Sequence, residues 1–394
     1  MTGALSCAAL LAGCDKHDEG SGGSADSAAT NPMEGKLGGK LIVRTSCSEA
    51  LINAVVPAFT EETGVSVRVI EAPVSELFSW YGSDAASGAA ALEPAADVVW
   101  GGDPSWYVGF EGLLDEYISG ENNAMREDCR NVDGCITPVT REVAVIAMGA
   151  QSFEGDGFPE VTGYESLLDE RLAEHVVMED PAASECGLAH LAGIEAELGA
   201  AEAVADSGAG EQDDDADTGD NAGEQDDESA DVQGDERDDA GRALDENAPW
   251  QYASDLLAAG ARVMTGDDAQ LAMADDSFVA LTSEQLVLCG LADGSLSLEP
   301  VYPRRGAFVT CGCTAIVLGC EHLAQAQAWI DFVMSQRCQQ ALVAEARTRS
   351  ARADVADPDG LPEVGEAVVP EREVLLATWS QVRDGTWEPA SAAE

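Results

Sequence analysis

The segment Leu41–Ile70, LIVRTSCSEALINAVVPAFTEETGVSVRVI, changes its hydrophobic period twice. Leu41–Thr45 is a short apolar run of the kind that forms a buried strand. Apolar residues then recur at helical spacing over Leu51–Phe59, and Ser46 and Glu49 have the S-x-x-E spacing of a capping box. The segment therefore predicts a buried strand that leads, through hydroxyl side chains, directly into a helix.

The same alternation continues along the chain. Gly64 is well placed to end the first helix, and the alternating valines after it predict a second strand. A second helix is expected over about Val74–Ala91, before a third apolar run, ADVVWGGD, that ends on Gly101, Gly102 and Asp103. Strands that alternate with helices in this way predict an α/β protein with a parallel sheet and right-handed crossovers.

Hydroxyl side chains follow strand ends at three places, which suggests a distributed binding site. In an open α/β sheet the ligand crevice lies beyond the carboxyl ends of the strands, where helix N-termini offer unpaired N–H groups. The pattern recurs in HVVMEDPAASECGLAHL (175–191) and FVALTSEQLVLCGL (278–291). Helix capping alone would explain these hydroxyls, and capping is compatible with ligand binding. The candidate ligand-binding residues are Thr45, Ser46, Ser48, Gly101, Gly102, Asp103, Ser184, Thr282, Ser283 and Glu284.

The composition excludes some classes of partner. The chain has 394 residues, which is enough for two domains. Its 74 acidic residues outnumber 20 Lys and Arg residues and give a formal net charge of −54. Nucleic acids and anionic lipid surfaces are bound through Lys and Arg, so neither is expected as a partner.

The first residues predict export. Gly3–Gly13 is a short apolar run that is typical of a signal peptide, and Leu11–Cys14 resembles the lipobox of bacterial lipoproteins, in which Cys14 would carry lipid. We expect a signal peptide at 1–14, a flexible tether at 15–38, and an extracytoplasmic protein that meets the membrane only through its lipid anchor. The alternative is an apolar tail with a chance cysteine, because no Lys or Arg precedes the run.

Eleven cysteines fit an extracytoplasmic protein. Cys129 and Cys135 are separated by five residues in a polar stretch and are the candidates for a local disulfide. Cys311, Cys313, Cys320 and His322 are residue types that bind zinc. However, the apolar pattern around Cys311 and Cys313 favours a buried strand in which these cysteines serve as small hydrophobic residues. We therefore expect no metal site and no cofactor.

The segment Ala205–Arg242 differs in composition from the rest of the chain. It is strongly acidic and has no aromatic residue, so it cannot bury enough apolar surface to become ordered. Some of its acids fall on calcium-loop positions, but the required glycine is displaced and no helices flank the loop. A disordered acidic insertion at 205–242 is therefore expected rather than a calcium site.

The succession of motifs resembles the type 2 periplasmic solute-binding proteins of ABC importers, in the branch that carries ferric iron, thiamine, phosphonates and phosphorylated sugars. The resemblance is carried by LIVRTSCSEALINAVVPAFTEETGVSVRV, ADVVWGGDPS, GYESLLDERLAEHVVMEDPAAS, EPVYPRRGAFVTCGCTAIVLGCEHLAQAQAWIDFVMSQRCQQAL and ARADV. It implies a two-lobe clamshell, in which each lobe is a mostly parallel sheet flanked by helices and crossing strands join the lobes. The implied parts are lobe one at 39–137, lobe two at 138–306, a return to lobe one at 307–345, and a C-terminal helical region at 346–394 that packs on the lobes.

The resemblance also implies a monomeric receptor, not an enzyme, that delivers a small-molecule ligand to a cognate ABC permease and its ATPase. Ferric-iron members carry adjacent tyrosines where this chain has Thr282-Ser283-Glu284, so phenolate coordination of iron is not expected. Hydroxyls at helix starts favour a phosphonate or phosphorylated metabolite, with Glu284 reading an amine or hydroxyl at its far end. The alternatives are a ferric-iron or thiamine receptor, and an extracytoplasmic sensor that feeds a two-component system. An enzyme is disfavoured because Cys186 and His190 have ordinary helix-packing spacing.

Overall fold

The computed structural model describes residues 36–79, 96–149, 159–199, 247–265, 272 and 278–389. Within it, Leu37–Glu394 forms one compact unit. The expected signal peptide with Cys14, almost all of the tether and the acidic insertion at 205–242 lie outside the described residues. Within the described ranges, no helix is both long and apolar enough to cross a membrane.

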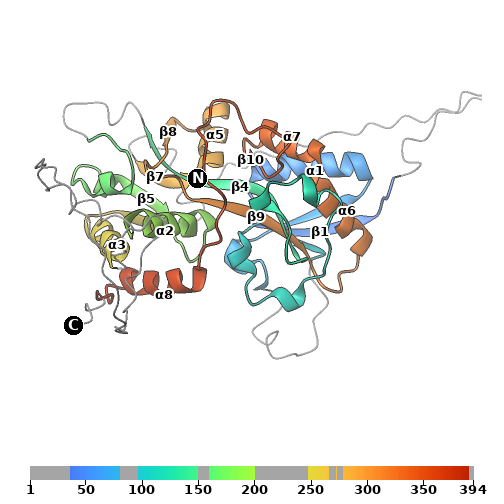
Figure 1. The fold of residues 1–394 in the computed structure, drawn as a ribbon, viewed down its shortest axis with the longest axis horizontal. Coiled ribbons are helices and arrows are strands. Elements are labelled where there is room, and N and C mark those ends of the chain that lie inside the picture. The colour runs from blue at the N-terminus through green and yellow to red at the C-terminus, as the bar shows by residue number, and fades with distance from the viewer. Residues whose placement is uncertain are drawn as a thin grey trace, which may run out of the picture. The chain divides into compact units, whose positions relative to one another are not determined.

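Lobe one begins with the parallel sheet that the opening segment predicts. The strands β1 (Lys40–Thr45), β2 (Ser66–Glu71) and β3 (Val98–Trp100) pair in the order β2-β1-β3, and β9 (Val309–Ile316) joins β3 antiparallel. The helices that flank this sheet are α1 (Glu49–Thr63), α6 (Leu323–Met334) and α7 (Gln336–Glu345) (Figure 1). The aromatic rings of Phe59, Trp100 and Trp329 meet edge to face in its core.

Lobe two repeats the plan with its own parallel strands. Here β5 (Val176–Glu179) lies between β6 (Arg262–Met264) and β7 (Val279–Ser283). Its helices are α2 (Glu185–Leu198), α3 (Ala248–Ala258), α5 (Glu284–Asp293) and α8 (Arg372–Arg383), and α8 packs against α2 and α3 (Figure 1). Short 3-10 helices complete the described chain: η1 (Val74–Glu76), η4 (Pro104–Tyr107), η5 (Glu111–Leu113), η6 (Asn122–Ala124), η7 (Glu127–Cys129), η8 (Tyr164–Leu168) and η9 (Ala173–His175).

The long strand β4 (Ile136–Gly149) joins the two lobes. Its first half pairs antiparallel with β9, and its second half pairs with β7 and with β8 (Leu298–Val301). Pro138, which cannot donate a ladder hydrogen bond, sits where the β4–β9 register shifts. Both lobes therefore share one continuous mixed sheet through β4 with helices on its flanks, which agrees with the α/β fold class predicted from the sequence.

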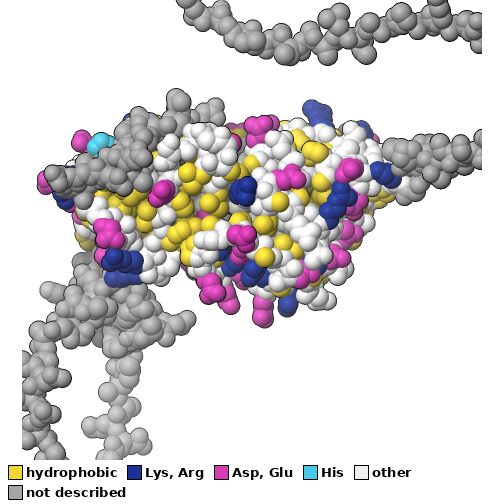
Figure 2. Space-filling view, turned by 90° about the horizontal axis from the view of Figure 1, so that it is seen from above, with side chains coloured by type: hydrophobic (Ala, Val, Ile, Leu, Met, Phe, Trp, Pro, Cys, Tyr) yellow, Lys and Arg dark blue, Asp and Glu magenta, His cyan; other side chains and the backbone are white. Residues whose placement is uncertain are grey.

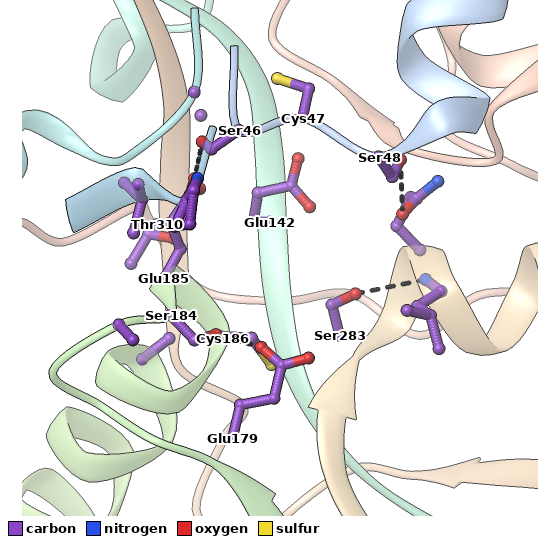
Figure 3. A pocket seen from close by; sticks show the side chains of 18 of the residues that line it. Ser46, Cys47, Ser48, Glu142, Glu179, Ser184, Glu185, Cys186, Ser283 and Thr310 are labelled. Carbon is purple, nitrogen blue, oxygen red and sulfur yellow. Dashed lines mark hydrogen bonds between the residues drawn. The ribbon is translucent and has the colours of Figure 1, made fainter. Parts of the chain in front are cut away.

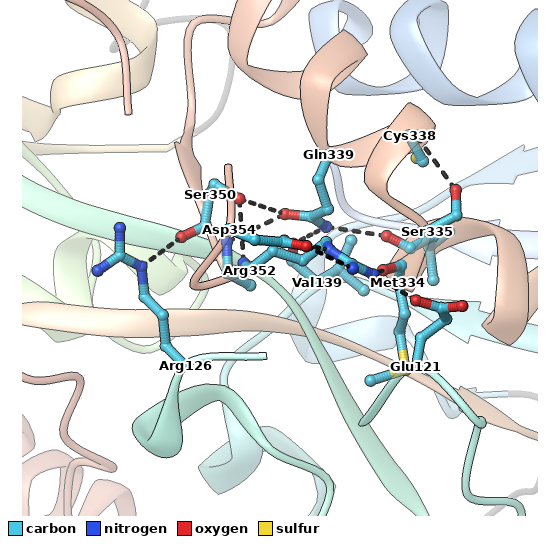
Figure 4. Close-up of polar contacts among 12 residues, drawn as sticks. Glu121, Arg126, Val139, Met334, Ser335, Cys338, Gln339, Ser350, Arg352 and Asp354 are labelled. Atoms are coloured by element: carbon cyan, nitrogen blue, oxygen red, sulfur yellow. Dashed lines mark hydrogen bonds and ion pairs between the residues drawn. The ribbon is translucent and has the colours of Figure 1, made fainter. Parts of the chain in front are cut away.

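A buried polar network fixes the chain that follows α7 onto β4 (Figure 4). Gln339 donates to the carbonyl of Val139 over 2.8 Å and accepts from the hydroxyl of Ser350 over 3.0 Å. Ser350 belongs to β10 (Arg349–Ser350), which pairs with β4, and Arg352 donates to Glu121 over 2.6 Å. Because these groups find their partners inside the protein, the network holds the start of the C-terminal region in one position.

The start of α1 differs from the capping box that the sequence suggested. The N-cap is Ser48, whose hydroxyl accepts from the N–H of Leu51, so Ser46 is not the cap. Gly64 ends the helix in the left-handed conformation, as predicted. Of the helix expected over Val74–Ala91, the structure describes only η1 and the residues up to Ser79.

The expected disulfide between Cys129 and Cys135 is absent, and both residues are free thiols. Turn η7 directs Cys129 into the core, where its Sγ lies 3.3 Å from Sγ of Cys311 on β9. Cys135 stands half-exposed just before β4. Cys311 and Cys313 are buried on β9, in agreement with the prediction that they act as small hydrophobes.

Lys and Arg side chains do not cluster on the face of the described protein that Figure 2 shows. Lys and Arg side chains are scattered there among Asp, Glu and apolar side chains. Several of the arginines pair with acids, as Arg337 does with Glu61 over 2.6 Å. The described surface on this face therefore lacks the continuous basic patch that binding to a phosphate backbone requires.

Candidate functional site

A cavity of about 860 Å³ lies where the strand ends of both lobes meet the crossing strands (Figure 3). It is large enough for a metabolite-sized ligand. Lobe one and lobe two both contribute hydroxyls at helix starts, and β4 and β9 contribute residues between them. Of the residues predicted from sequence, the cavity is lined by Thr45, Ser46, Ser48, Gly101, Ser184 and Ser283.

On the lobe-one side, a tight turn after β3 approaches the loop after β1. Gly101 has a φ of 122°, and a Cβ atom there would lie 2.0 Å from Oγ of Ser46. Only glycine fits such a close approach in this conformation. The N–H of Ser46 donates to the carbonyl of Trp100 over 3.1 Å, and the hydroxyl of Thr45 accepts from the N–H of Cys47 over 3.0 Å. This corner of the cavity is therefore fixed by backbone contacts.

On the lobe-two side, the predicted hydroxyls act as helix caps. Ser184 accepts from the N–H of Gly187 at the start of α2, and Ser283 accepts from the N–H of Leu286 at the start of α5. The hydroxyl of Ser184 also donates to Glu179. Both serines therefore cap a helix and line the cavity, so their role as caps does not exclude a role in ligand binding.

Four of the predicted residues do not line the cavity. Asp103 is 2% exposed and caps η4, and Thr282 is 3% exposed within β7. Glu284 is 2% exposed and forms a two-pronged ion pair with Arg349, both contacts being 2.8 Å. The remaining residue, Gly102, points its N–H at Glu185. Glu284 therefore belongs to a buried ion pair and does not line the cavity, whereas the sequence suggested that it reads a ligand.

The structure adds carboxylates that the sequence did not single out. The acidic residues of the lining are Glu71, Glu142, Glu179, Asp180 and Glu185, and none of the lining residues in the described ranges is Lys or Arg. Figure 3 shows Glu142 on β4 between the hydroxyls of lobe one and lobe two. A signal was available, because Arg141 and Glu142 place two charges in the otherwise mostly apolar stretch Pro138–Met148.

Asp180 already has cationic and polar partners, whereas Glu142, Glu179 and Glu185 have no cationic partner among the described residues. Arg383 on α8 lies 3.3 Å from Asp180. Burial raises the pKa of Glu142 and of Glu179, and the nearby Glu284 adds to the effect at Glu142. Raised pKa values in a cleft are typical of residues that meet a ligand.

The pKa of Glu185 is raised to about 7, principally by burial and further by the charges of Glu142 and Asp103. Hydrogen bonds from Ser46 and Gly102 act in the opposite direction. The half-buried carboxyl therefore titrates close to neutral pH.

The two lobes touch across this cavity through Glu185. The hydroxyl of Ser46 donates to Oε1 of Glu185 over 2.6 Å, and the N–H of Gly102 donates to the same atom over 2.7 Å. A longer contact of 3.5 Å joins the hydroxyl of Ser48 to Oε1 of Gln285. Residues far apart in the sequence thus meet at one corner of the site.

The His and Cys residues near the cavity do not form catalytic machinery. His190 is fully buried, and its ring lies 2.9 Å from both the hydroxyl of Tyr164 and the carbonyl of Thr282. Burial lowers its pKa to about 4, and burial raises the pKa of the Cys186 thiol. A structural histidine and a protonated thiol do not make a nucleophile–base pair. Nor do the described residues include a group of three or more His, Cys, Asp or Glu that could hold a metal ion.

The comparisons with known proteins agree with this architecture. The family model "Bacterial extracellular solute-binding protein" matches residues 54–366, which is more than half of the chain. A search of curated protein sequences found no match.

Solved structures of binding proteins share the fold at low sequence identity. The periplasmic binding protein P5PA is 14% identical, with a TM-score of 0.64 over 88% of this chain and 98% of its own. The periplasmic binding protein AfuA from Actinobacillus pleuropneumoniae, with fructose-6-phosphate bound, is 16% identical, with a TM-score of 0.63 over 88% and 96%. The ferric binding protein from Campylobacter jejuni is 16% identical, with a TM-score of 0.62 over 87% and 99%. With the family model matching over most of its length, the chain belongs to the bacterial extracellular solute-binding proteins.

Proposed function

We propose that this protein captures a small cationic solute and delivers it to the permease of an ABC importer. The observation that carries the proposal is the composition of the cavity, whose described lining contains five acids and no Lys or Arg. Glu142, Glu179 and Glu185 have no cationic partner among the described residues, and a cationic ligand would supply one.

The energetic argument concerns the three carboxylates without a cationic partner among the described residues. Burying a charge is costly unless an opposite charge offsets it, which is why the pKa values of Glu142, Glu179 and Glu185 are raised. A protonated amine, a quaternary nitrogen or a thiazolium ring would supply the missing charge. Thiamine, an alternative from the sequence, carries such a ring.

A phosphonate or phosphorylated metabolite, which the sequence favoured, fits this cavity less well than a cationic solute does. The expectation rested on hydroxyls at helix starts, and those of Ser48, Ser184 and Ser283 accept from the N–H groups of their own helices. An anion would also be surrounded by carboxylates without a lining Lys or Arg. The sugar phosphate belongs to AfuA, which at 16% identity supports the fold and not the ligand.

The proposal is tested by titrating the ligand-stripped protein in a calorimeter. Thiamine, choline and spermidine are the cationic probes. Methylphosphonate, glucose 6-phosphate and ferric citrate represent the phosphonate, sugar-phosphate and ferric ligands for comparison. We expect saturable binding among the cations only, and native mass spectrometry of protein purified from its host should show a bound mass of a cationic compound. Binding of phosphonate or sugar phosphate in the absence of any cation binding would overturn the proposal.

The proposal includes anchoring to the membrane, as expected from the lipobox-like Leu11–Cys14. We expect the protein from the native start to enter the detergent phase of a phase separation and Cys14→Ser to move it to the aqueous phase. Equal partitioning of the two forms would rule out lipid on Cys14.

Cation affinity should rise with pH between about 6 and 8. The pKa of Glu185 is raised to about 7 in the free protein, so at pH 6 a bound cation must first displace a proton. Glu142 and Asp103 face Glu185 and hold its pKa up, whereas a bound cation would lower it. The loss below pH 7 can reach about tenfold per pH unit for each proton released.

The measurement is a set of calorimetric titrations at several pH values, each repeated in buffers of different ionisation enthalpy to count protons. Proton release near pH 7 is the expected sign. Affinity that falls as pH rises, or proton uptake on binding, would contradict a cationic ligand at these carboxylates.

A further inference from the structure

Two hydrogen-bond donors of lobe one converge on a single point in the cavity. The hydroxyl of Ser46 and the N–H of Gly102 both reach Oε1 of Glu185, over 2.6 and 2.7 Å. Lobe two supplies that oxygen from the first residue of α2. The contact therefore joins segments separated by 139 and 83 positions in the sequence.

The backbone that carries these donors is rigidly placed. Gly101 donates to the carbonyl of Cys313 over 2.7 Å, and the carbonyl of Gly102 accepts from the N–H of Cys313 over 2.9 Å. Both glycines have positive φ angles, 122° and 76°, which non-glycine residues rarely adopt. The turn thus presents the N–H of Gly102 to Oε1 of Glu185, beside the hydroxyl of Ser46, an arrangement suited to one oxygen of an anion.

We propose that Glu185 is a built-in occupant of an anion-binding position and that it determines specificity by keeping anionic solutes out of this corner. The inference rests on the solute-binding function proposed above, but it does not depend on the charge of the solute. Where another anion receptor would bind a phosphate or carboxylate oxygen of its ligand, this chain places its own carboxylate oxygen.

Occupation by a residue of the same chain is effective for two physical reasons. An intramolecular group acts at a high effective concentration, so an external anion must compete with a contact that is already formed. The carboxylate at the first turn of α2 is also favoured by the dipole of that helix. Removal of the carboxylate should leave both donors available to a small anion.

The test compares three variants with the unchanged protein in titrations with inorganic phosphate, followed by calorimetry and phosphorus NMR. Glu185→Ala vacates the position, and Glu185→Gln keeps a carbonyl oxygen that can still accept from both donors. Glu195→Ala, on an exposed position of the same helix, is the matched control. We expect millimolar phosphate binding by Glu185→Ala, at least about tenfold tighter than by the other two variants and the unchanged protein.

Three results would overturn the proposal. One is a folded Glu185→Ala variant that binds no phosphate; another is equal binding by the unchanged protein. The third is equal binding by Glu185→Gln, because then charge repulsion, and not occupancy, excludes the anion. Glu185→Ser also vacates the position and replaces the alanine variant should that variant not fold. Ser46→Ala in the Glu185→Ala background should abolish the gain, because it removes one of the two donors.

The outcome separates this inference from the proposed function. Phosphate binding by Glu185→Ala, with no cation binding by the unchanged protein, would refute the cationic ligand and retain the role of Glu185. Cation binding by the unchanged protein, with no phosphate binding by Glu185→Ala, would refute the role of Glu185 alone.

Discussion

Replacement of Arg349 by methionine should lower the free energy of unfolding by about 3–5 kcal/mol, because it leaves a buried carboxylate without its partner. Arg349 and Glu284 are 3% and 2% exposed, and two contacts of 2.8 Å join them. Tyr302 donates a further hydrogen bond to Glu284 over 2.7 Å, but a phenol cannot neutralise the charge. Denaturant unfolding at pH 7, with the unchanged protein as reference, measures the loss.

Two further variants give this prediction its controls. Arg337→Met removes two exposed ion pairs, with Glu61 and Glu62, whose side chains are 74% and 45% exposed, and it should cost at most about 1 kcal/mol. Combining Arg349→Met with Glu284→Gln removes both buried charges and should restore part of the stability. That double variant should retain ligand binding, because Glu284 does not line the cavity and acts on Glu142 only through its charge. A small effect of Arg349→Met, similar to that of Arg337→Met, would show that the buried pair is not critical.

Local patterns in the sequence predicted the local structure well. The change of hydrophobic period in Leu41–Ile70 placed β1, α1 and β2, since burial along one face of a helix and burial of alternate residues in a strand impose different periods. The serines at the starts of α2 and α5 were predicted at helix starts because a hydroxyl satisfies an N–H group there. Each of these inferences depends on residues within one turn or one strand.

Contacts between distant segments could not be predicted in the same way. Glu284 follows a cap serine just as Glu185 does, and nothing local distinguishes the two acids. Arg349, which lies 65 positions away in the sequence, pairs with Glu284 in the interior, whereas Glu185 faces the cavity. The same limit explains the cysteines, because the partner of Cys129 in the core, Cys311, lies 182 positions away. Tertiary packing decides which of several equivalent side chains is available to a ligand.

The second large effect concerns Glu142, whose replacement by glutamine should weaken cation binding by about 30-fold or more. The estimate follows from the 2–5 kcal/mol that removal of one partner from a buried charge pair costs. Glu142 extends from β4 into the cavity (Figure 3), and a Cβ atom on Gly312 of the neighbouring strand would lie 2.5 Å from Oγ1 of Thr140. Glutamine keeps the shape and can still accept a hydrogen bond from Thr140, so the change tests charge alone.

The same variant should be more stable than the unchanged protein in the absence of ligand. Burial raises the pKa of Glu142, and a carboxyl with a raised pKa destabilises the folded state as pH rises through that pKa. Glutamine does not titrate, so its advantage should be present at pH 8 and should vanish towards pH 4. Loss of affinity together with a gain of stability is typical of a residue that binds the ligand and destabilises the ligand-free protein.

Calorimetric titration with the best cationic probe and thermal unfolding at pH 8 and pH 4 measure the two effects. Glu299→Gln, on an exposed position of β8 beside β4, is the matched control and should change neither affinity nor stability. Stability that rises without any loss of affinity would show that Glu142 does not meet the solute. Loss of both affinity and stability would indicate general damage to the fold. If the ligand supplies the positive charge that the cavity lacks, Glu142→Gln should lower the affinity for the cation and raise the stability of the free protein.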